Sequence, residues 1–316
     1  MTSASLYRRA IPSAARISVW QAADGWPLRR FDWPGAGRGS VLWLGGRGEF
    51  FEKYLELFAH WHASGWSVSA FDWRGQGGSG RVGDPHIGHI GSFAEWIADL
   101  AGFWAEWSAA ARGPRVVVAH SMGGHLALRG VLEGAADPSA LVLSAPMLGV
   151  RSPVGMALGE ALASAAARIG DPARAAWREN EEPGATMSRQ AMLTHDPDRY
   201  QDELWWQAAQ PELLLGPPSW RWVAEAFRST RLVRGHPGLR TLATPVLLLL
   251  PMADALVDPR SALAVAARLP AAKAVTYGPE AAHEILREAD PVRARALAEI
   301  DLFLAECAPA ERAPAA

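Results

Sequence analysis

The stretch Val116-Val117-Val118-Ala119-His120-Ser121-Met122-Gly123-Gly124 decides the fold of this chain. Its valines predict a buried strand, residues 126–132 predict a helix, and Ser121 stands at the tight turn between them. A serine hydroxyl is a poor nucleophile unless a sharp turn presents it to a base, and small residues two positions before and after it allow that turn to form. Ala119 and Gly123 occupy those positions. Ser121 is therefore the candidate nucleophile, and the alternative is that it only caps the helix.

Outward from this stretch, short apolar runs alternate with longer helical patterns, which is typical of parallel strands joined by crossover helices. The runs that predict strands are 16–21 and 28–33, which flank an Asp24-Gly25 turn signal, followed by 40–44, 67–73, 115–120, 140–145, 245–250 and 274–277. Ser92 and Glu95 match a capping box at a helix start, and Asp258-Pro259 and Asp290-Pro291 each match an N-cap followed by a first-turn proline. The predicted fold class is α/β, with a mostly parallel eight-stranded sheet flanked by helices.

One long stretch breaks the alternation, because residues 148–239 are helical and loop-like in pattern and contain no convincing strand. We expect this stretch to be an inserted helical cap that covers the carboxyl ends of the strands, where such sheets bind ligands. Residues 1–147 and 240–307 would then form the core domain. The Ala- and Pro-rich tail, 308–316, is expected to be disordered.

A carboxylate and a histidine follow the serine in the order that a serine triad requires in such a fold. Asp254 and His283 each come after a predicted strand in the last third of the chain. The histidine would accept the proton of the serine, and the carboxylate would fix the histidine tautomer. Asp254 is preferred to Asp258 because Asp258 precedes Pro259, as a helix N-cap often does. The predicted triad is Ser121, Asp254 and His283.

Catalysis by such a triad also needs backbone N–H donors for the oxyanion, one from the residue after the nucleophile and one from the loop after the third strand. Met122 follows the serine, and Arg47 lies in the run Gly45-Gly46-Arg47-Gly48. Glycines free this loop to point an amide into the site, although a plain strand-to-helix turn also uses them. The amides of Arg47 and Met122 form the predicted oxyanion hole.

Two other motifs do not indicate a cofactor. The run from Gly75 to Gly80 satisfies G-x-G-x-x-G after a strand, but no helix opens directly after it, so we interpret it as flexible backbone beside the active site. His86 and His89, with Asp84, lie in a loop that holds no further cluster of metal-ligand types. Neither a cofactor nor a metal is expected.

Composition excludes further function classes. The formal net charge of −2, from 31 basic and 33 acidic residues, does not favour nucleic acid as a partner. The single cysteine, Cys307, cannot form an internal disulfide, which favours a reducing compartment. No apolar run approaches the roughly 20 residues that span a bilayer, and residues 1–16 lack the apolar centre of a secretory signal. We expect a cytoplasmic protein with at most peripheral membrane contact, and the sequence leaves its oligomeric state open.

The motifs together resemble the lysophospholipase L2 and monoacylglycerol-lipase-like branch of the α/β-hydrolases, of the serine aminopeptidase S33 type. The resemblance is carried by Gly46-Arg47-Gly48-Glu49, Asp72-Trp73-Arg74-Gly75-Gln76-Gly77-Gly78-Ser79-Gly80, Ala119-His120-Ser121-Met122-Gly123-Gly124 and Ala282-His283-Glu284-Ile285-Leu286. It spans about residues 41–304 and is weakest in the predicted cap. It implies the α/β-hydrolase fold, with the cap inserted after the sixth strand, and ester hydrolysis on single-acyl-chain lipids without a metal or cofactor.

The predicted function is therefore that of a serine carboxylic-ester hydrolase whose substrate is a small-molecule ester or lipid, with lysophospholipid or monoacylglycerol favoured. A hydrolase of small non-lipid esters, amides or thioesters is one alternative, because the same triad serves all of them. A non-catalytic binding protein of the same fold is another. In the cap, Trp205 and Trp206 would either pack its own core or bind substrate by lining an acyl-chain tunnel.

Overall fold

The computed structural model describes residues 8–177 and 188–310, and its centre is a single eight-stranded sheet in the order β1-β2-β4-β3-β5-β6-β7-β8. The strands are β1 (Arg16–Gln21), β2 (Pro27–Trp33), β3 (Gly39–Leu44), β4 (Trp66–Phe71), β5 (Arg115–His120), β6 (Ala140–Ser144), β7 (Val246–Pro251) and β8 (Ala272–Tyr277). The pairs β1–β2 and β2–β4 are antiparallel and the other neighbours are parallel, which confirms the predicted α/β sheet.

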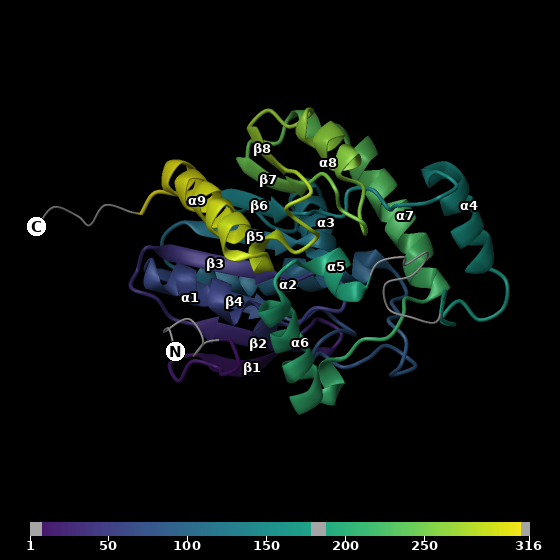
Figure 1. Cartoon of the computed structure of the whole chain (residues 1–316), viewed down its shortest axis with the longest axis horizontal. Helices are drawn as coiled ribbons and strands as arrows, with labels where there is room; N and C mark the ends of the chain where they lie inside the picture. Colours follow the sequence, from purple (N-terminus) through teal and green to yellow (C-terminus); the bar gives the residue numbers. More distant parts are fainter. Residues whose placement is uncertain (1–7, 178–187, 311–316) are drawn as a thin grey trace, which may run out of the picture.

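Helices flank this sheet (Figure 1). In chain order they are η2 (Phe51–Tyr54), α1 (Leu55–Ala63), α2 (Phe93–Ala110), α3 (Ser121–Leu132), α4 (Met156–Ala166), α5 (Arg189–Leu193), α6 (Pro197–Ala209), η3 (Pro211–Leu213), α7 (Trp220–Gly235), η4 (Pro237–Arg240), α8 (Pro259–Ala266), η5 (Ile285–Arg287) and α9 (Asp290–Cys307). Within the described ranges, none of these helices combines the length and apolarity needed to cross a bilayer.

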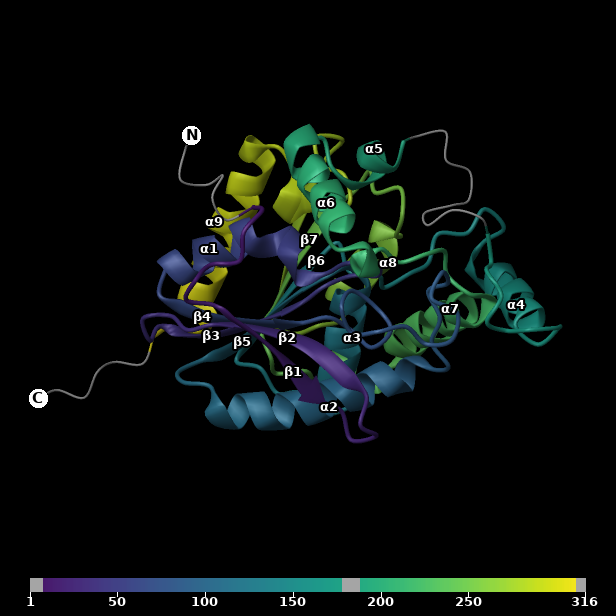
Figure 2. The same cartoon turned by 90° about the horizontal axis from the view of Figure 1, so that it is seen from below.

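The core lies on both faces of the sheet, as β5 illustrates. Val116 and Val118 pack into the apolar cluster under α1 and α9, whereas Val117 and Ala119 pack into the cluster under α2 and α3. Figure 2 shows these two helix pairs on opposite sides of the sheet. Alternate strand residues point to opposite faces, so a strand buried on both faces needs the continuous apolar run that the sequence shows.

Two strand bounds differ from the prediction by two residues, and the others agree to within one residue. The strand predicted at 67–73 ends at Phe71. The carboxylate of the next residue, Asp72, accepts hydrogen bonds from the amides of Phe51 and Gly78, and the backbone leaves the sheet there. The last strand begins at Ala272, two residues earlier than predicted. Its first residues lie at the sheet edge and are partly exposed, so they carry no apolar signal.

The helix starts follow the predicted capping chemistry in two of three places. Ser92 and Glu95 form both hydrogen bonds of a capping box at α2, and Asp258 caps α8. The prediction for Asp290 is wrong by one residue, since Ala289 is the N-cap of α9 and Asp290 is its first residue. The carboxylate of Asp290 instead accepts a hydrogen bond from Nη2 of Arg199 at 2.7 Å.

The chain between β6 and β7 contains helices and, among its described residues, only isolated β-bridges. Figure 1 shows α4 and α7 beside each other beyond the sheet, with α5 and α6 nearer to its centre. The division into a core and a cap at residues 148 and 239 stays a prediction. The predicted tail, 308–316, falls largely outside the described residues.

Candidate active site

The turn after β5 holds Ser121 in a backbone conformation that side chains seldom adopt, with φ of 51°. The turn forms because Gly123 has no Cβ, which would lie 2.3 Å from the carbonyl oxygen of Gly45. The N-cap of α3 is His120, and no side chain caps this helix, so the alternative role of Ser121 as a cap is wrong. A strained, half-buried serine at a strand end is typical of a nucleophile held for attack.

The structure brings Ser121, His283 and Asp254 into one hydrogen-bonded row. Nδ1 of His283 lies 2.6 Å from Oδ2 of Asp254, and Nε2 lies 2.9 Å from Oγ of Ser121. Because the carboxylate can only accept, Nδ1–H donates to it and Nε2 is left to accept the serine hydroxyl. The loops after β7 and β8 supply the acid and the histidine, and both side chains are buried.

Electrostatics favour the proton-accepting role of this histidine. Burial alone would lower the pKa of His283, but the charge of Asp254 and its hydrogen bond, with smaller contributions from Glu284 and Glu49, raise the pKa above its ordinary value of 6.5. The carboxylate thus stabilises the imidazolium that forms when the serine loses its proton.

Asp258 lies outside this row. Its carboxylate accepts hydrogen bonds from the amides of Arg260 and Ser261 at the start of α8, as expected for an N-cap. Asp254 uses its other oxygen, Oδ1, to accept from the amides of Leu256 and Val257. The two aspartates therefore contact different groups: Asp254 contacts His283, and Asp258 caps the start of α8.

The loop of Arg47 lies directly against the serine, since a Cβ on Gly46 would be 3.0 Å from Cβ of Ser121. The amide of Gly48 donates to Oε1 of Gln76 at 2.6 Å, which holds the loop from the other side. Met122 lies in the first turn of α3, where backbone amides have no acceptor within the helix. The structure thus brings together the two segments that the predicted oxyanion hole requires.

Sequence reasoning gave no role to Glu49, Gln76 and His120. Glu49 accepts hydrogen bonds from the amide of Gly46 and from Tyr54, and lies 2.9 Å from Nδ1 of His120. Gln76 comes from the glycine-rich run at 75–80, which therefore lies beside the site as predicted. These residues stand in the quoted motifs, but apolar periodicity says nothing about which polar groups meet across loops.

Trp205 and Trp206 are not brought to the serine by any contact of the described residues. The indole of Trp206 is buried and donates to the carbonyl oxygen of Arg8 at 2.8 Å. Trp205 is 40% exposed and lies 5.8 Å from the guanidinium of Arg9. These contacts fit packing of α6 against the chain start, and the acyl-tunnel role stays a prediction.

The described residues contain no group of three or more His, Cys, Asp or Glu side chains that could hold a metal ion. In the loop that holds His86 and His89, Nδ1 of His89 lies 2.8 Å from Oγ of Ser219, the residue that precedes α7.

Known proteins are similar to this chain in sequence and in fold. Residues 35–290 match the family model described as serine aminopeptidase, S33. Lysophospholipase L2 of Escherichia coli (strain K12) is 34% identical over 277 residues, which cover 82% of this chain and 78% of that protein. Among solved structures, a soluble variant of monoglyceride lipase from Saccharomyces cerevisiae, in complex with a substrate analog, superposes with a TM-score of 0.72 at 19% identity, covering 93% of this chain and 97% of that one. Monoacylglycerol lipase from Paleococcus ferrophilus gives 0.69 at 21% identity, over 88% and 98%.

Proposed function

The chain belongs to the serine aminopeptidase S33 family of α/β-hydrolases and is a hydrolase of the esterase and lipase type, and from that premise we propose that it cleaves carboxylic esters of single-acyl-chain lipids through an acyl-enzyme. The observation that carries the proposal is the contact of Nε2 of His283 with Oγ of Ser121, backed by Asp254. A nucleophile, a base and an orienting acid at hydrogen-bond distance are the parts that acyl transfer requires.

In the proposed reaction, Oγ of Ser121 attacks the ester carbonyl while its proton passes to Nε2 of His283. The amides of Arg47 and Met122 stabilise the oxyanion. The intermediate collapses to the acyl-enzyme, and the departing alcohol takes the proton from the histidine. Water then attacks the acyl group with the same histidine as base, which releases the fatty acid and restores the serine.

The names of similar proteins favour a lipid with one acyl chain. The relative at 34% identity is named lysophospholipase L2, and the fold matches two lipases of monoacylglycerols. We therefore propose lysophospholipids and monoacylglycerols as the substrate class of this chain.

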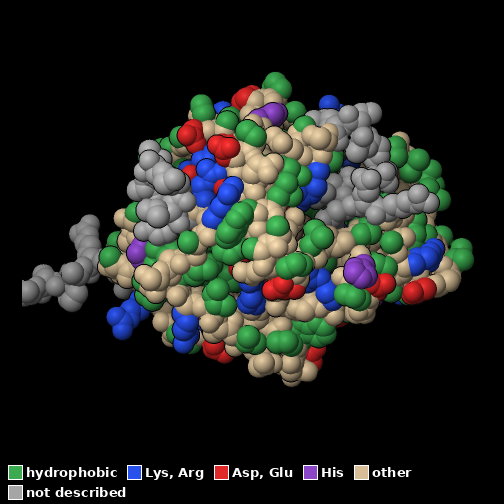
Figure 3. Space-filling model, turned by 60° about the horizontal axis from the view of Figure 1, so that its bottom comes forward, with side chains coloured by type: hydrophobic (Ala, Val, Ile, Leu, Met, Phe, Trp, Pro, Cys, Tyr) green, Lys and Arg blue, Asp and Glu red, His purple; other side chains and the backbone are tan. Residues whose placement is uncertain are grey.

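Surface chemistry around α4 supports contact with a lipid aggregate. Leu158 and Leu162 are each 53% exposed on this helix, and Ile169 beyond it is 70% exposed. In the view of Figure 3, hydrophobic side chains gather at the right-hand edge, where α4 lies in Figure 1. The exposed Arg151 and Arg168 flank these positions, so anionic lipids would be favoured.

Leu158→Glu with Leu162→Glu should abolish co-sedimentation with anionic vesicles and leave hydrolysis of a short soluble ester unchanged.

A substrate panel tests the proposal directly. Lysophospholipids, monoacylglycerols and p-nitrophenyl esters of graded chain length are assayed with the wild type and with Ser121→Ala. We expect lipid hydrolysis by the wild type, loss of all hydrolysis in the variant, and fluorophosphonate labelling that disappears with the serine. Activity on short esters alone would contradict the lipid assignment, and unchanged activity of the variant would contradict the nucleophile.

A further inference from the structure

Four charged side chains, Lys53, Glu203, Glu284 and Arg287, form a buried charge cluster next to the candidate active site. Nζ of Lys53 lies 2.8 Å from Oε2 of Glu203 and 2.8 Å from Oε1 of Glu284. Nη1 of Arg287 lies 3.1 Å from Glu203 and also pairs with Glu284. All four side chains are at most 4% exposed.

The members of this cluster keep their charges despite burial. Burial alone would lower the pKa of Lys53, but the charges of Glu203, Glu284 and the neighbouring Glu49 raise it. Burial would raise the pKa of both glutamates. The charge of Lys53, with Arg189 and Arg287 at Glu203 and with Arg287 at Glu284, instead lowers each pKa to about 2. Buried ion pairs contribute little net stability, because desolvation offsets their attraction. A cluster of this kind therefore calls for another explanation, and its connections provide one.

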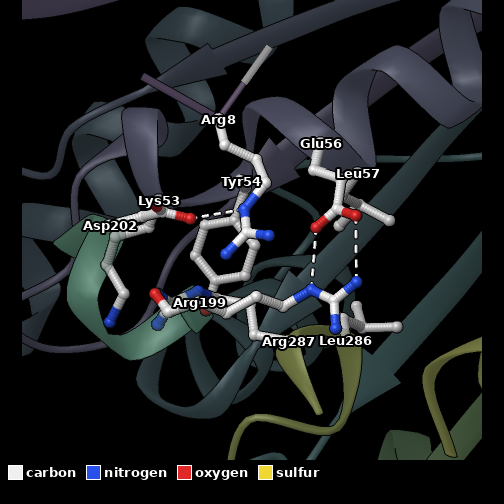
Figure 4. Close-up of a pocket in the computed structure, with 9 residues that line it drawn as sticks. All are labelled: Arg8, Lys53, Tyr54, Glu56, Leu57, Arg199, Asp202, Leu286 and Arg287. Carbon is white, nitrogen blue, oxygen red and sulfur yellow. Dashed lines mark hydrogen bonds and ion pairs between the residues drawn. The ribbon is translucent and has the colours of Figure 1, made fainter. Parts of the chain in front are cut away.

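The cluster joins three parts of the chain that are distant in sequence. Lys53 belongs to η2, just after the loop of Arg47, while Glu203 belongs to α6 and Glu284 directly follows His283. Glu203 also accepts a hydrogen bond from Nη2 of Arg189 on α5 at 2.6 Å, so this carboxylate of α6 links α6 to α5 as well as to Lys53. Figure 4 shows Lys53 of η2, Arg199 and Asp202 of α6, and Arg287 around one pocket, with α6 facing the core through charged side chains.

The backbone of His283 is held from two sides by groups next to this cluster. Its amide donates to the carbonyl oxygen of Met192, at the end of α5, at 3.2 Å, and the amide of Glu284 donates to Leu193 at 2.8 Å. From the opposite side, Nε2 of His120 lies 3.2 Å from the carbonyl oxygen of His283. The histidine loop thus takes its position from an inserted helix as well as from the sheet.

The loop of Arg47 is connected to the same cluster through Glu49. Oε1 of Glu49 lies 3.7 Å from Nζ of Lys53, and this residue also accepts from the amide of Gly46. The guanidinium of Arg47 donates to the carbonyl oxygen of Gly216 in the inserted segment at 2.5 Å. The loop of His283 and the loop of Arg47 therefore both contact the segment between β6 and β7.

We propose that Lys53, bridging Glu203 of α6 and Glu284, is a positioning residue that couples the placement of α5 and α6 to the orientation of His283 and of the loop of Arg47. Without the bridge, Glu203, which also binds Arg189 of α5, loses an ion-pair link to Glu284 beside His283. The placement of α5, whose carbonyls accept from the amides of His283 and Glu284, is then less firmly tied to the histidine loop. Displacements well below 1 Å matter at a reacting centre, where a misplacement of about 1 Å can cost about 100-fold in rate.

The test rests on the proposed function and uses the double variant Lys53→Met with Glu203→Gln, which removes one charge of each sign. We measure the second-order rate of inactivation by a small fluorophosphonate, kcat and KM for p-nitrophenyl acetate, and Tm. We expect inactivation and kcat to fall together by about 10- to 100-fold, with KM unchanged. Failure of the wild type to react with the fluorophosphonate would instead contradict the proposed function itself.

The matched control is Asp99→Asn, which removes the buried ion pair of Asp99 with Arg74, at 2.7 Å, on the other face of the sheet. We expect a lower Tm and a wild-type inactivation rate. If the double variant does not fold, Lys53→Arg takes its place, because it keeps the charge but changes the geometry, and the same loss of inactivation rate is expected. A folded variant that reacts as fast as the wild type, one that changes only KM, or an equal loss of rate in the control would each overturn the proposal.

Discussion

Replacing Asp254 by Asn tests the triad most sharply, because the structure dictates how the amide must lie. Oδ1 of Asp254 accepts from the amides of Leu256 and Val257, at 2.7 and 3.1 Å, whereas Oδ2 faces Nδ1 of His283. An asparagine oxygen must remain with the two backbone donors, so its NH₂ group faces the histidine. Nδ1 would then have to accept, and Nε2 would carry the proton and could no longer take one from Ser121.

The expected loss is about 10⁴-fold in kcat, the size of effect seen when a serine triad has the wrong tautomer. That factor corresponds to about 5 kcal/mol of activation free energy. The control is Asp258→Ala, which removes an N-cap and should cost about 1 kcal/mol of unfolding free energy with kcat almost unchanged. Both are read from p-nitrophenyl ester turnover and thermal unfolding. Near-normal kcat in Asp254→Asn, with a large loss in Asp258→Ala, would refute this reasoning.

Three further predictions follow from buried groups and tight contacts. The pKa of His283 lies above 6.5 and the histidine must be neutral to accept a proton, so the acid limb of the kcat/KM pH profile should have its midpoint above pH 6.5. Glu284→Gln removes a charge that raises this pKa and should move the acid limb to lower pH. An acid limb that stays in place would contradict this prediction. Glu203, with a pKa of about 2 against an ordinary 4.5, stabilises the folded state above pH 4.5 and loses that contribution as the pH falls towards 2, so urea unfolding of Glu203→Gln should show a weaker pH dependence in this window than the wild type. Gly123→Ala would place Cβ 2.3 Å from the carbonyl oxygen of Gly45 and should give little folded protein on expression, whereas Gly235→Ala, with no atom within 4 Å of its new Cβ, should fold normally.

Most of the sheet could be predicted because its strands are short apolar runs bounded by turn residues. β5 and β7, buried on both faces, show a continuous apolar signal, and their predicted bounds fall within one residue of the structure. The edge strand β8 is partly exposed, so its first two residues carry no such signal. Asp290 shows the same limit for helices, since Asp-Pro marks a helix start but does not decide which of two residues is the cap.

The candidate site divides in a similar way. Chain order and position after predicted strands pointed to Ser121, Asp254 and His283, which the structure brings into contact. The contacts of Glu49 and of the buried charge cluster depend on side chains that are distant in sequence. Lys53 and Glu203, for example, are 150 residues apart. Patterns within a window cannot report such pairs, because the pairing is set only once α6 lies on the core.

The helices between β6 and β7 have two different roles. α5 holds the backbone of His283, and α7 contacts the core through buried polar pairs such as Ser229 with His125 of α3, at 2.7 Å. A change in these helices therefore reaches the reacting groups through hydrogen bonds whose loss is costly when they are buried. By contrast, α4 turns Leu158 and Leu162 to solvent. Its ion pair of Glu160 with Arg231 is partly exposed, because the Arg231 side chain is 59% exposed, so the pair contributes little to stability. Substitutions on the outer face of α4 can thus alter what the protein contacts without moving the triad, whereas substitutions in α5 or α6 that alter substrate choice should also alter kcat.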